Sequence, residues 1–395
     1  MISQRLRASL DSSICIRDIF EEGKKLAAIY GKENIYNFSI GNPSVEPPQI
    51  VNEAMKAILD EEPALALHGY PANVGHPEVR QHIADYLNEK YDCTYNVDSI
   101  IMTSGAASAI AMLCNTLLDE GDEVITFAPY FWEYKSYVET FYGTLVPALC
   151  DMNTLQPDPD TFRAAFSPRT KFVLINTPNN PTGAVYTPES LRMVASILEE
   201  KQKEYGHPIY LVSDEPYRKL AYGMEVPYLT HYYKNTIVVY SYSKALSIPG
   251  ERIGYAAIQP DVDEFEDLLA GMTASMRYLG YVNAPSLQQK MLLKCVDATV
   301  DISIYEETRD ILYQGLTDMG YTCIHPDGAF YLFVKALEED DAHFCEMAKK
   351  EKILMAPGTA FYGPGWVRIS YCVPKEVAER SLPGFANLMK RYQEN

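Results

Sequence analysis

The sequence predicts an α/β fold in two parts: a large domain with a seven-stranded, mostly parallel sheet flanked by helices, and a smaller α+β domain. From about residue 97, short β-branched runs alternate with longer stretches of helical period. After about residue 260 this alternation stops, and helical stretches are followed by a few short strands. A chain of 395 residues also exceeds what one hydrophobic core usually serves, so two domains are expected.

The strands of the large domain are short apolar runs bounded by polar or turn residues. They are rich in Val, Ile, Leu and aromatic residues, as buried strands of a parallel sheet are. The runs cover residues 99–104, 123–128, 144–149, 171–176, 209–214, 236–241 and 252–258.

Helices are expected between these strands. Residues 107–121 carry apolar side chains at every third or fourth position and end at Gly121, a C-cap residue. Residues 187–206 begin with Thr187 as N-cap and Pro188 at the first helical position. Ligands bind such sheets at the carboxyl ends of the strands, so the residues that follow each strand are the functional candidates.

We expect the large domain to span residues 49–280. The smaller domain is expected to comprise residues 281–395, in which GAFYLFVKA and WVRISYC read as strands. Residues 1–48 are expected to cross over and pack on it, completing the smaller domain.

The charge of the chain limits its partners. With 34 Lys plus Arg against 53 Asp plus Glu, the net charge of -19 disfavours a nucleic acid partner. An anionic small molecule must then be held by a few local arginines or backbone amides.

Cysteine usage and the absence of long apolar segments indicate the compartment. The eight cysteines form no Cys-x-x-Cys pair, which predicts reduced thiols and neither a disulfide framework nor a metal site. No signal peptide and no stretch of roughly 20 apolar residues is found, so no membrane partner and a cytoplasmic location are expected.

Small and aromatic residues follow the first two strands. Gly105, Ala106 and Ala107 lead directly into a helix, where free amides and the helix dipole can hold an anion. Phe131 offers a flat aromatic face at the sheet edge. Taken alone, each has an ordinary explanation as packing.

Polar residues follow the next three strands. Asn180 lies in the turn TPNNPTG, and Asp214 ends a strand with Tyr217 three positions on. Ser241 ends the following strand, with Lys244 and Arg252 beyond it. A plain loop, a helix cap and a solvated lysine are the ordinary explanations of these residues taken one at a time.

One planar ligand accounts for all five strand ends together. A phosphate needs amides and an arginine, an aromatic ring needs a stacking face, and a protonated ring nitrogen needs a carboxylate. A ring hydroxyl oxygen needs Asn and Tyr donors, and an aldehyde needs a lysine that forms a Schiff base. That ligand is pyridoxal 5'-phosphate.

The sequence resembles the class I and II aminotransferases, fold type I of the pyridoxal-phosphate enzymes, and particularly their aspartate aminotransferase-like group. The ordered set of motifs carries the resemblance through nearly the whole chain. The motifs are GNP near residue 41, HGYPANVGHPEVR from residue 68, TSGAASA, NTPNNPTG, SDEPY, SYSKALSIPGERIGY and WVRIS.

The resemblance implies roles at the cofactor. Lys244 is similar to the Schiff-base lysine and Asp214 to the carboxylate that pairs with the pyridine nitrogen. The other implied contacts are Asn180 and Tyr217 to the ring hydroxyl oxygen, Phe131 as stacking aromatic, and Gly105, Ala106, Ala107, Ser241 and Arg252 around the phosphate.

The resemblance also implies a dimer and a substrate site. Tyr70 is similar to the tyrosine that reaches the cofactor phosphate of the opposite subunit, which predicts a homodimer with shared active sites. Arg368 is similar to the arginine that takes the substrate α-carboxylate bidentately, with Gly41 and Asn180 beside it. By analogy Ser12, Ser13, Phe330 and Phe361 approach the side-chain pocket, although structural contacts explain them equally well.

The sequence departs from the family pattern in three places. Ala106 and Ala107 stand where many relatives have Gly followed by a polar residue, and Phe131 stands where several have Trp. No residue matches the arginine that such enzymes use for a dicarboxylate side chain, which puts aspartate as substrate in doubt.

The predicted activity is that of an aminotransferase moving an amino group between an L-amino acid and a 2-oxo acid by a ping-pong mechanism through a Lys244 Schiff base. Another fold type I enzyme, such as a β-lyase, a decarboxylase or a cyclising enzyme, is the alternative within this fold. A non-catalytic binding module is disfavoured by the intact lysine and by the lack of a basic DNA-binding extension. A nicotinamide dehydrogenase is disfavoured because no Gly-x-Gly-x-x-Gly follows the first strand.

Overall fold

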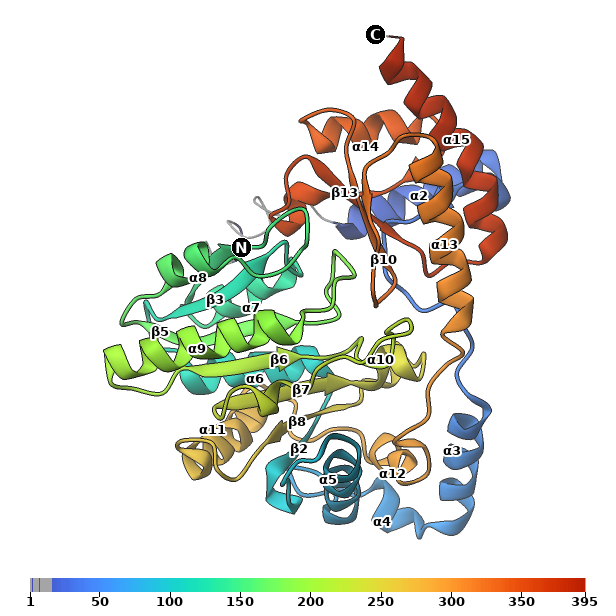
Figure 1. Ribbon diagram of the computed structural model, residues 1–395. Helices are drawn as coiled ribbons and strands as arrows, with labels where there is room; N and C mark the ends of the chain where they lie inside the picture. The colour runs from blue at the N-terminus through green and yellow to red at the C-terminus, as the bar shows by residue number, and fades with distance from the viewer. Residues whose placement is uncertain (1, 3–6, 8–15, 395) are drawn as a thin grey trace.

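The computed structural model describes residues 2, 7 and 16–394 (Figure 1). Its larger part is built on a seven-stranded sheet with strand order β2-β8-β7-β6-β5-β3-β4. The strands from β7 to β4 are parallel, whereas β8 runs antiparallel to both of its neighbours. All seven predicted strands are confirmed: β2 (Ile100–Thr103), β3 (Glu123–Ala128), β4 (Thr144–Leu149), β5 (Thr170–Asn176), β6 (Tyr210–Asp214), β7 (Thr236–Ser241) and β8 (Gly254–Ile258).

Both faces of the sheet are apolar and covered, because successive side chains of a strand point to opposite faces. Val124 and Leu174 face one layer of helices, whereas their chain neighbours Ile125 and Val173 face another. The first layer is α6 (Ala106–Leu117), α7 (Glu133–Thr140) and α11 (Phe265–Tyr278). The second is α8 (Pro159–Ala165) and α9 (Pro188–Tyr205).

A third group of helices covers the β2 end of the sheet, at the bottom of Figure 1. The predicted division at residue 280 assigns residues 286–295 to the smaller domain, whereas Met291 and Leu292 pack in the same cluster as Ile100 of β2. That division stays a prediction. The group comprises α3 (Gln49–Glu61), α4 (Ala64–His68), α5 (Pro77–Tyr91) and α12 (Ser286–Cys295).

The smaller part is α+β, as predicted. Its main sheet is antiparallel with order β12-β13-β10-β9, and the two predicted strands of this part pair directly, Phe333 opposite Arg368. The strands are β1 (Tyr36–Asn37), β9 (Cys323–Ile324), β10 (Tyr331–Lys335), β11 (Ile353–Leu354), β12 (Ala356–Pro357) and β13 (Trp366–Ser370). The helices are α2 (Ile16–Tyr30), α13 (Ser303–Asp318), α14 (Asp341–Lys349) and α15 (Lys375–Gln393).

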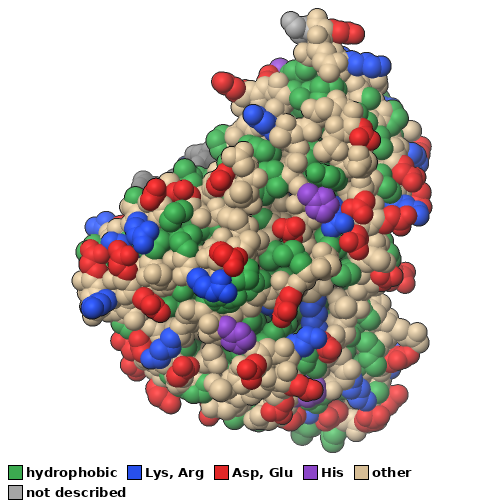
Figure 2. Space-filling model, viewed as in Figure 1, with side chains coloured by type: hydrophobic (Ala, Val, Ile, Leu, Met, Phe, Trp, Pro, Cys, Tyr) green, Lys and Arg blue, Asp and Glu red, His purple; other side chains and the backbone are tan. Residues whose placement is uncertain are grey.

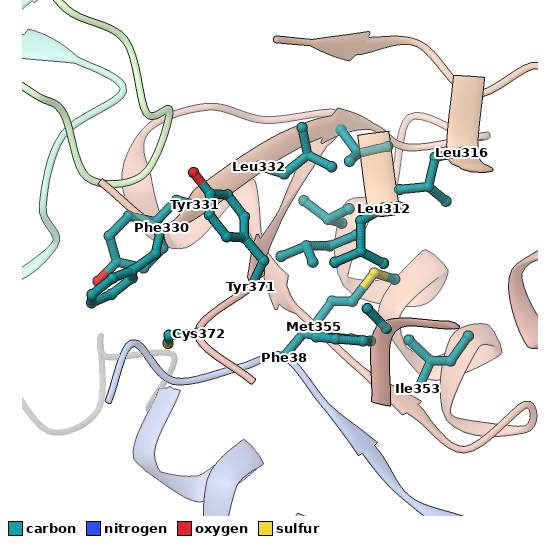
Figure 3. Close-up of a cluster of buried hydrophobic side chains, with 14 of the residues drawn as sticks. Phe38, Leu312, Leu316, Phe330, Tyr331, Leu332, Ile353, Met355, Tyr371 and Cys372 are labelled. Carbon is teal, nitrogen blue, oxygen red and sulfur yellow. The ribbon is translucent and has the colours of Figure 1, made fainter. Parts of the chain in front are cut away.

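The smaller part has its own buried core, drawn in Figure 3. Phe38 enters this core from the N-terminal segment, which is held by the parallel pairing of β1 with β11. Leu312 and Leu316 of α13 pack against Leu332 of β10 in the same cluster. The N-terminal segment from residue 16 therefore packs on the C-terminal part of the chain.

Acidic residues outnumber basic residues in this chain, and they are spread widely over the face of the molecule drawn in Figure 2. Figure 2 shows acidic side chains spread across this face with basic ones scattered between them. Among residues 16–394, no helix has the length and apolar character that crossing a bilayer requires.

Candidate active site

A cavity of about 640 Å³ lies where the carboxyl ends of β5, β6 and β7 face the smaller part of the molecule. This is the position at which parallel sheets bind ligands. Of the described residues predicted for the site, Gly105, Tyr70, Phe330 and Phe361 are outside its lining. The others line it: Gly41, Ala106, Ala107, Phe131, Asn180, Asp214, Tyr217, Ser241, Lys244, Arg252 and Arg368.

Lys244 lies on the single-turn helix α10 (Tyr242–Ala245), which follows β7 directly. Its Nζ donates a hydrogen bond to the carbonyl oxygen of Gly41 (3.0 Å) and lies 5.4 Å from the ring centre of Phe330. Burial, together with repulsion from Arg252 and Arg368, lowers the pKa of Lys244 to about 8. A large fraction of this amine is therefore neutral near pH 8, as a nucleophile and proton acceptor must be.

Asp214 is the last residue of β6 and is buried in the floor of the cavity. The hydroxyl of Tyr134 donates to its Oδ2 (2.5 Å), whereas its Oδ1 is buried and has no hydrogen-bond partner. Burial raises the pKa of Asp214 to about 7, although the Tyr134 hydrogen bond opposes the rise. An unsatisfied buried acceptor of this kind can take an N–H group from a ligand.

Arg252, Ser241 and the first turn of α6 line the part of the cavity where the sequence predicts a phosphate. The guanidinium of Arg252 donates to the carbonyl oxygens of Pro249 (2.9 Å) and Ser104 (3.1 Å). Gly105 has a φ of +85°, which L side chains rarely adopt, and an added Cβ would also lie 2.8 Å from Nη2 of Arg252. The N-terminal amides of a helix have no partner within it, so those of α6 are available to a phosphate.

Asn180 and Tyr217 bring two further polar groups to the cavity. The Nη1 of Arg368 donates to Oδ1 of Asn180 (3.0 Å); since an arginine can only donate, Asn180 has its Nδ2 left to donate elsewhere. The hydroxyls of Tyr217 and Tyr331 form a hydrogen bond of 2.9 Å.

Arg368 is a buried cation at the smaller-domain side of the cavity, 3% exposed. Its Nη2 donates to the carbonyl oxygen of Ser39 (2.6 Å), and its Nε has no hydrogen-bond partner. Burial lowers the pKa of this guanidinium, and its charge faces neutral polar groups in the part of the chain that the structure describes. A carboxylate ligand would supply the missing countercharge.

Phe131 and Tyr70 differ in whether they reach the cavity. Phe131 lines the cavity, and its ring packs edge-on against that of Tyr134, with centres 5.5 Å apart. Tyr70 does not reach the cavity of its own chain, because it is 91% exposed. Its role toward an opposite subunit stays a prediction, and Ser12 and Ser13 lie outside the described residues.

The structure adds residues that the sequence did not single out. Tyr134, which holds Asp214, lies three residues after Phe131 in the segment APYFWEY, where only the flat aromatic was identified. Tyr331, the first residue of β10, directly follows Phe330, and Glu133 lines the cavity from α7. Further residues of the lining are Ile40, Trp132, Tyr137, Asn176 and Ser243.

The unsatisfied groups of the cavity fit pyridoxal 5'-phosphate and an amino acid. The orphaned Oδ1 of Asp214 suits a protonated ring nitrogen, and Arg252 with the α6 amides suits a phosphate. Lys244 suits an aldehyde, and Arg368 suits the α-carboxylate of a substrate.

Comparison with known proteins agrees with this geometry. The sequence pattern described as aminotransferase class I and II matches residues 33–382. The chain is 32% identical over 394 residues to a probable aspartate aminotransferase of Methanocaldococcus jannaschii, covering 97% of this chain and 98% of the relative. It is 31% identical over 373 residues to the aspartate/prephenate aminotransferase of Thermus thermophilus, covering 89% of this chain and 90% of the relative.

Solved structures show the same similarity. The crystal structure of an aminotransferase from Eubacterium rectale has a TM-score of 0.96 and 48% sequence identity, with 99% of both chains covered. A single mutant of the aspartate aminotransferase of Thermus thermophilus has a TM-score of 0.87 and 28% identity, covering 98% of this chain and 99% of that one. The chain belongs to the class I and II aminotransferases, which use pyridoxal 5'-phosphate to transfer amino groups between amino acids and 2-oxo acids.

Proposed function

We propose that this enzyme carries out its ping-pong transfer between an L-amino acid and a 2-oxo acid in the cavity described above, with Lys244 as the lysine that binds the cofactor covalently. The observation that carries the proposal is the set of partners around three ionisable side chains of the cavity. Lys244, Asp214 and Arg368 line one cavity, and each is hydrogen-bonded only to uncharged groups in the described part of the chain. A ligand that offers a ring N–H, an aldehyde and a carboxylate would complement all three side chains.

The residues that would hold the cofactor follow from this arrangement. Asp214 would accept from the ring nitrogen, and Asn180 and Tyr217 would donate to the ring oxygen. Arg252 and Ser241, with the amides of α6, would hold the phosphate. Pyridoxal phosphate, when bound, supplies an electron sink for the negative charge that develops at the substrate Cα.

Lys244 has the properties of the proton-transfer group. Its lowered pKa of about 8 provides neutral amine at physiological pH, and a neutral amine can take the proton from the substrate Cα. Its Nζ donates to the Gly41 carbonyl oxygen, two residues after Ser39, whose carbonyl oxygen accepts from Arg368.

Arg368 positions the substrate. Its planar guanidinium matches a carboxylate bidentately, and the buried site excludes water from this contact. Holding the α-carboxylate fixes the Cα relative to Lys244, which is the main requirement for proton transfer.

We further propose a homodimer in which Tyr70 completes the site of the opposite subunit. Support comes from large side chains that a single chain leaves in solvent: Leu65 is 89% exposed, Tyr70 91% and Tyr278 80%. The Nδ2 of Asn73 donates to the carbonyl oxygen of Val282 (2.7 Å), so the segments that carry Tyr70 and Tyr278 lie side by side. Burial of such a surface by a second copy would remove apolar area from water.

The cytoplasmic location stays a prediction.

Spectroscopy of the cofactor-loaded protein tests the function. A panel of L-amino acids is added to the purified enzyme, and conversion of the visible absorbance to that of the amine form of the cofactor is followed. We expect conversion by at least one amino acid, release of its 2-oxo acid, and reversal when a second 2-oxo acid is added. Release of ammonia without any need for an acceptor would contradict the proposal.

Lys244→Ala supplies the matching variant. It should lose the absorbance of lysine-bound cofactor and reduce turnover by about 10³-fold or more. The exposed Lys234, which pairs with Asp263, provides the control variant Lys234→Ala, and this should behave as wild type. Full activity of Lys244→Ala would exclude the assigned role.

A further inference from the structure

Tyr331 lies at the junction of the two parts of the molecule. It is the first residue of β10, is 2% exposed, and lines the cavity together with residues of the large sheet. Figure 3 shows it beside Phe330 and Tyr371 at one end of the buried cluster of the smaller part. A tyrosine so placed contacts residues on both sides of the cavity.

On one side, the Tyr331 hydroxyl lies 2.9 Å from that of Tyr217. Tyr217 has one proton to donate, and by its place in the site that proton goes to the ring oxygen of the cofactor. The Tyr217 oxygen is then an acceptor, so Tyr331 must be the donor in this pair. A hydroxyl that accepts a hydrogen bond becomes a stronger donor itself, because hydrogen bonds in a chain polarise one another.

On the other side, the ring of Tyr331 lies against the guanidinium of Arg368. The distance from Cζ of Arg368 to the ring centre is 4.7 Å, and the ring of Phe361 lies 4.5 Å from the same atom. Two aromatic faces therefore stabilise the cation and restrict its orientation. This contact needs the ring of Tyr331 but not its hydroxyl.

The position of the hydroxyl is fixed by Gly41. A Cβ added to Gly41 would lie 2.1 Å from the Tyr331 hydroxyl oxygen, so the glycine leaves the space that the hydroxyl occupies. The carbonyl oxygen of Gly41 also accepts the hydrogen bond of Lys244. Tyr331 is thus packed against the segment that orients the lysine.

We propose that Tyr331 is a positioning residue that couples the two halves of the active site. Its hydroxyl strengthens Tyr217 as a donor to the cofactor, and its ring holds Arg368 for the substrate carboxylate. The proposal rests on the function proposed above, since it assigns Tyr331 a part in that same site. The hydroxyl and the ring of Tyr331 therefore have different effects: the hydroxyl acts on the cofactor through Tyr217, and the ring acts on substrate binding through Arg368.

The first test is spectroscopic and needs no substrate. Tyr331→Phe keeps the ring and removes the hydroxyl. Because a weaker Tyr217 donor leaves more electron density on the ring oxygen, the pH midpoint of the visible absorbance of lysine-bound cofactor should rise by about 0.5 pH unit. The same substitution in a Tyr217→Phe background should cause no further rise.

The second test separates substrate binding from the cofactor. Tyr331→Leu removes the ring as well, and it should raise KM for the L-amino acid that converts wild type fastest by about 5- to 30-fold. Tyr331→Phe should change this KM by less than about 2-fold, because the ring remains. Tyr331→Met replaces Tyr331→Leu if the latter fails to fold.

Tyr222→Phe is the control for loss of a buried tyrosine hydroxyl. Tyr222 belongs to the same cluster, donates to the carbonyl oxygen of Ala329 (2.5 Å) and does not line the cavity. Its variant should keep the wild-type midpoint and KM. An unchanged midpoint in Tyr331→Phe, an equal shift in Tyr222→Phe, or a shift that persists without the Tyr217 hydroxyl would each overturn the proposal.

The outcomes also distinguish this inference from the proposed function. If wild type binds the cofactor and converts an amino acid while Tyr331→Phe matches it in midpoint, only the inference fails. If wild type shows no absorbance of lysine-bound cofactor, the proposed function fails and the inference fails with it.

Discussion

The hydroxyl of Tyr134 donates a hydrogen bond to one carboxylate oxygen of Asp214, with 2.5 Å between Oη and Oδ2, and the other oxygen is buried without a partner. One oxygen is thus held by the protein and the other is left for a ligand. Burial favours the neutral form of this carboxyl group and raises its pKa to about 7, although the Tyr134 hydrogen bond opposes the rise.

The first prediction concerns the stability of the cofactor-free protein. The pKa of Asp214 is higher in the folded chain than its ordinary value of 3.8, so its contribution is fully present below pH 3.8 and is lost as pH rises through about 7. Asp214→Asn has no carboxyl group to titrate, so its free energy of unfolding lacks this pH-dependent decrease. Between pH 5 and pH 8, we expect the free energy of unfolding of wild type to fall by about 3 kcal/mol relative to that of Asp214→Asn.

Urea unfolding of both proteins at a series of pH values measures this difference. Tyr134→Phe is the companion variant: without the hydrogen bond the pKa of Asp214 should rise further, which extends the pH-dependent loss to higher pH. Curves of wild type and Asp214→Asn that run parallel across this range would contradict the assigned pKa.

The second prediction concerns Arg368. Arg368→Lys keeps a positive charge but cannot donate two parallel hydrogen bonds to a carboxylate. We expect KM for the amino acid substrate to rise about 10- to 100-fold, while the affinity for pyridoxal phosphate changes little. The exposed Arg163, paired with Glu200, offers Arg163→Lys as control. Equal KM values for Arg368→Lys and wild type would argue against carboxylate binding here.

The third prediction concerns the choice of substrate side chain. Glu133 places an acidic side chain in the lining of the cavity, and its carboxylate accepts a hydrogen bond from Tyr137. A second carboxylate on the substrate would be repelled by it. Glu133→Gln should therefore raise the ratio of kcat/KM for L-aspartate to that for L-alanine by about 5-fold.

Glu139→Gln is the matched control, because Glu139 lies on the same helix and pairs with Lys135 outside the cavity. Its ratio should equal that of wild type. If Glu133→Gln leaves the ratio unchanged as well, Glu133 does not discriminate between these substrates.

The fourth prediction tests Tyr70 by subunit mixing. Tyr70→Ala and Lys244→Ala should each have little activity alone. In a hybrid dimer, one of the two sites contains intact Lys244 from one chain and intact Tyr70 from the other, so the hybrid purified from co-expressed variants should have about half the activity of wild type. No recovery in the purified hybrid would mean that Tyr70 serves its own chain or neither.

The strands and their functional ends were predictable because each leaves a local pattern. The β-branched runs gave all seven strands of the large sheet, and the residues that follow them, from Ala106 to Arg252, converge on one cavity. The carboxyl ends of parallel strands lie at the same edge of a sheet whatever the strand order. The convergence of these residues can therefore be predicted without knowing any tertiary contact.

Contacts between distant residues were not predictable in this way. Tyr134 and Asp214 are 80 positions apart, and Tyr217 and Tyr331 are 114 apart. Their side chains are common buried types, and only packing reveals which hydroxyl meets which partner. The same holds for Met291 of α12, whose apolar periodicity predicts a helix but not the layer that it joins.

The antiparallel direction of β8 relative to β7 determines how far apart Lys244 and Arg252 lie along the chain. Since Ser241 at the end of β7 pairs with Gly254 at the start of β8, the chain leaves the sheet edge and returns to it within a dozen residues. Lys244 and Arg252 both lie in this single return, so the spacing between these two side chains depends on the length of one loop. Inserting one residue between positions 246 and 250 would lengthen this loop and change the spacing between Lys244 and Arg252, although no side chain of the cavity would be substituted.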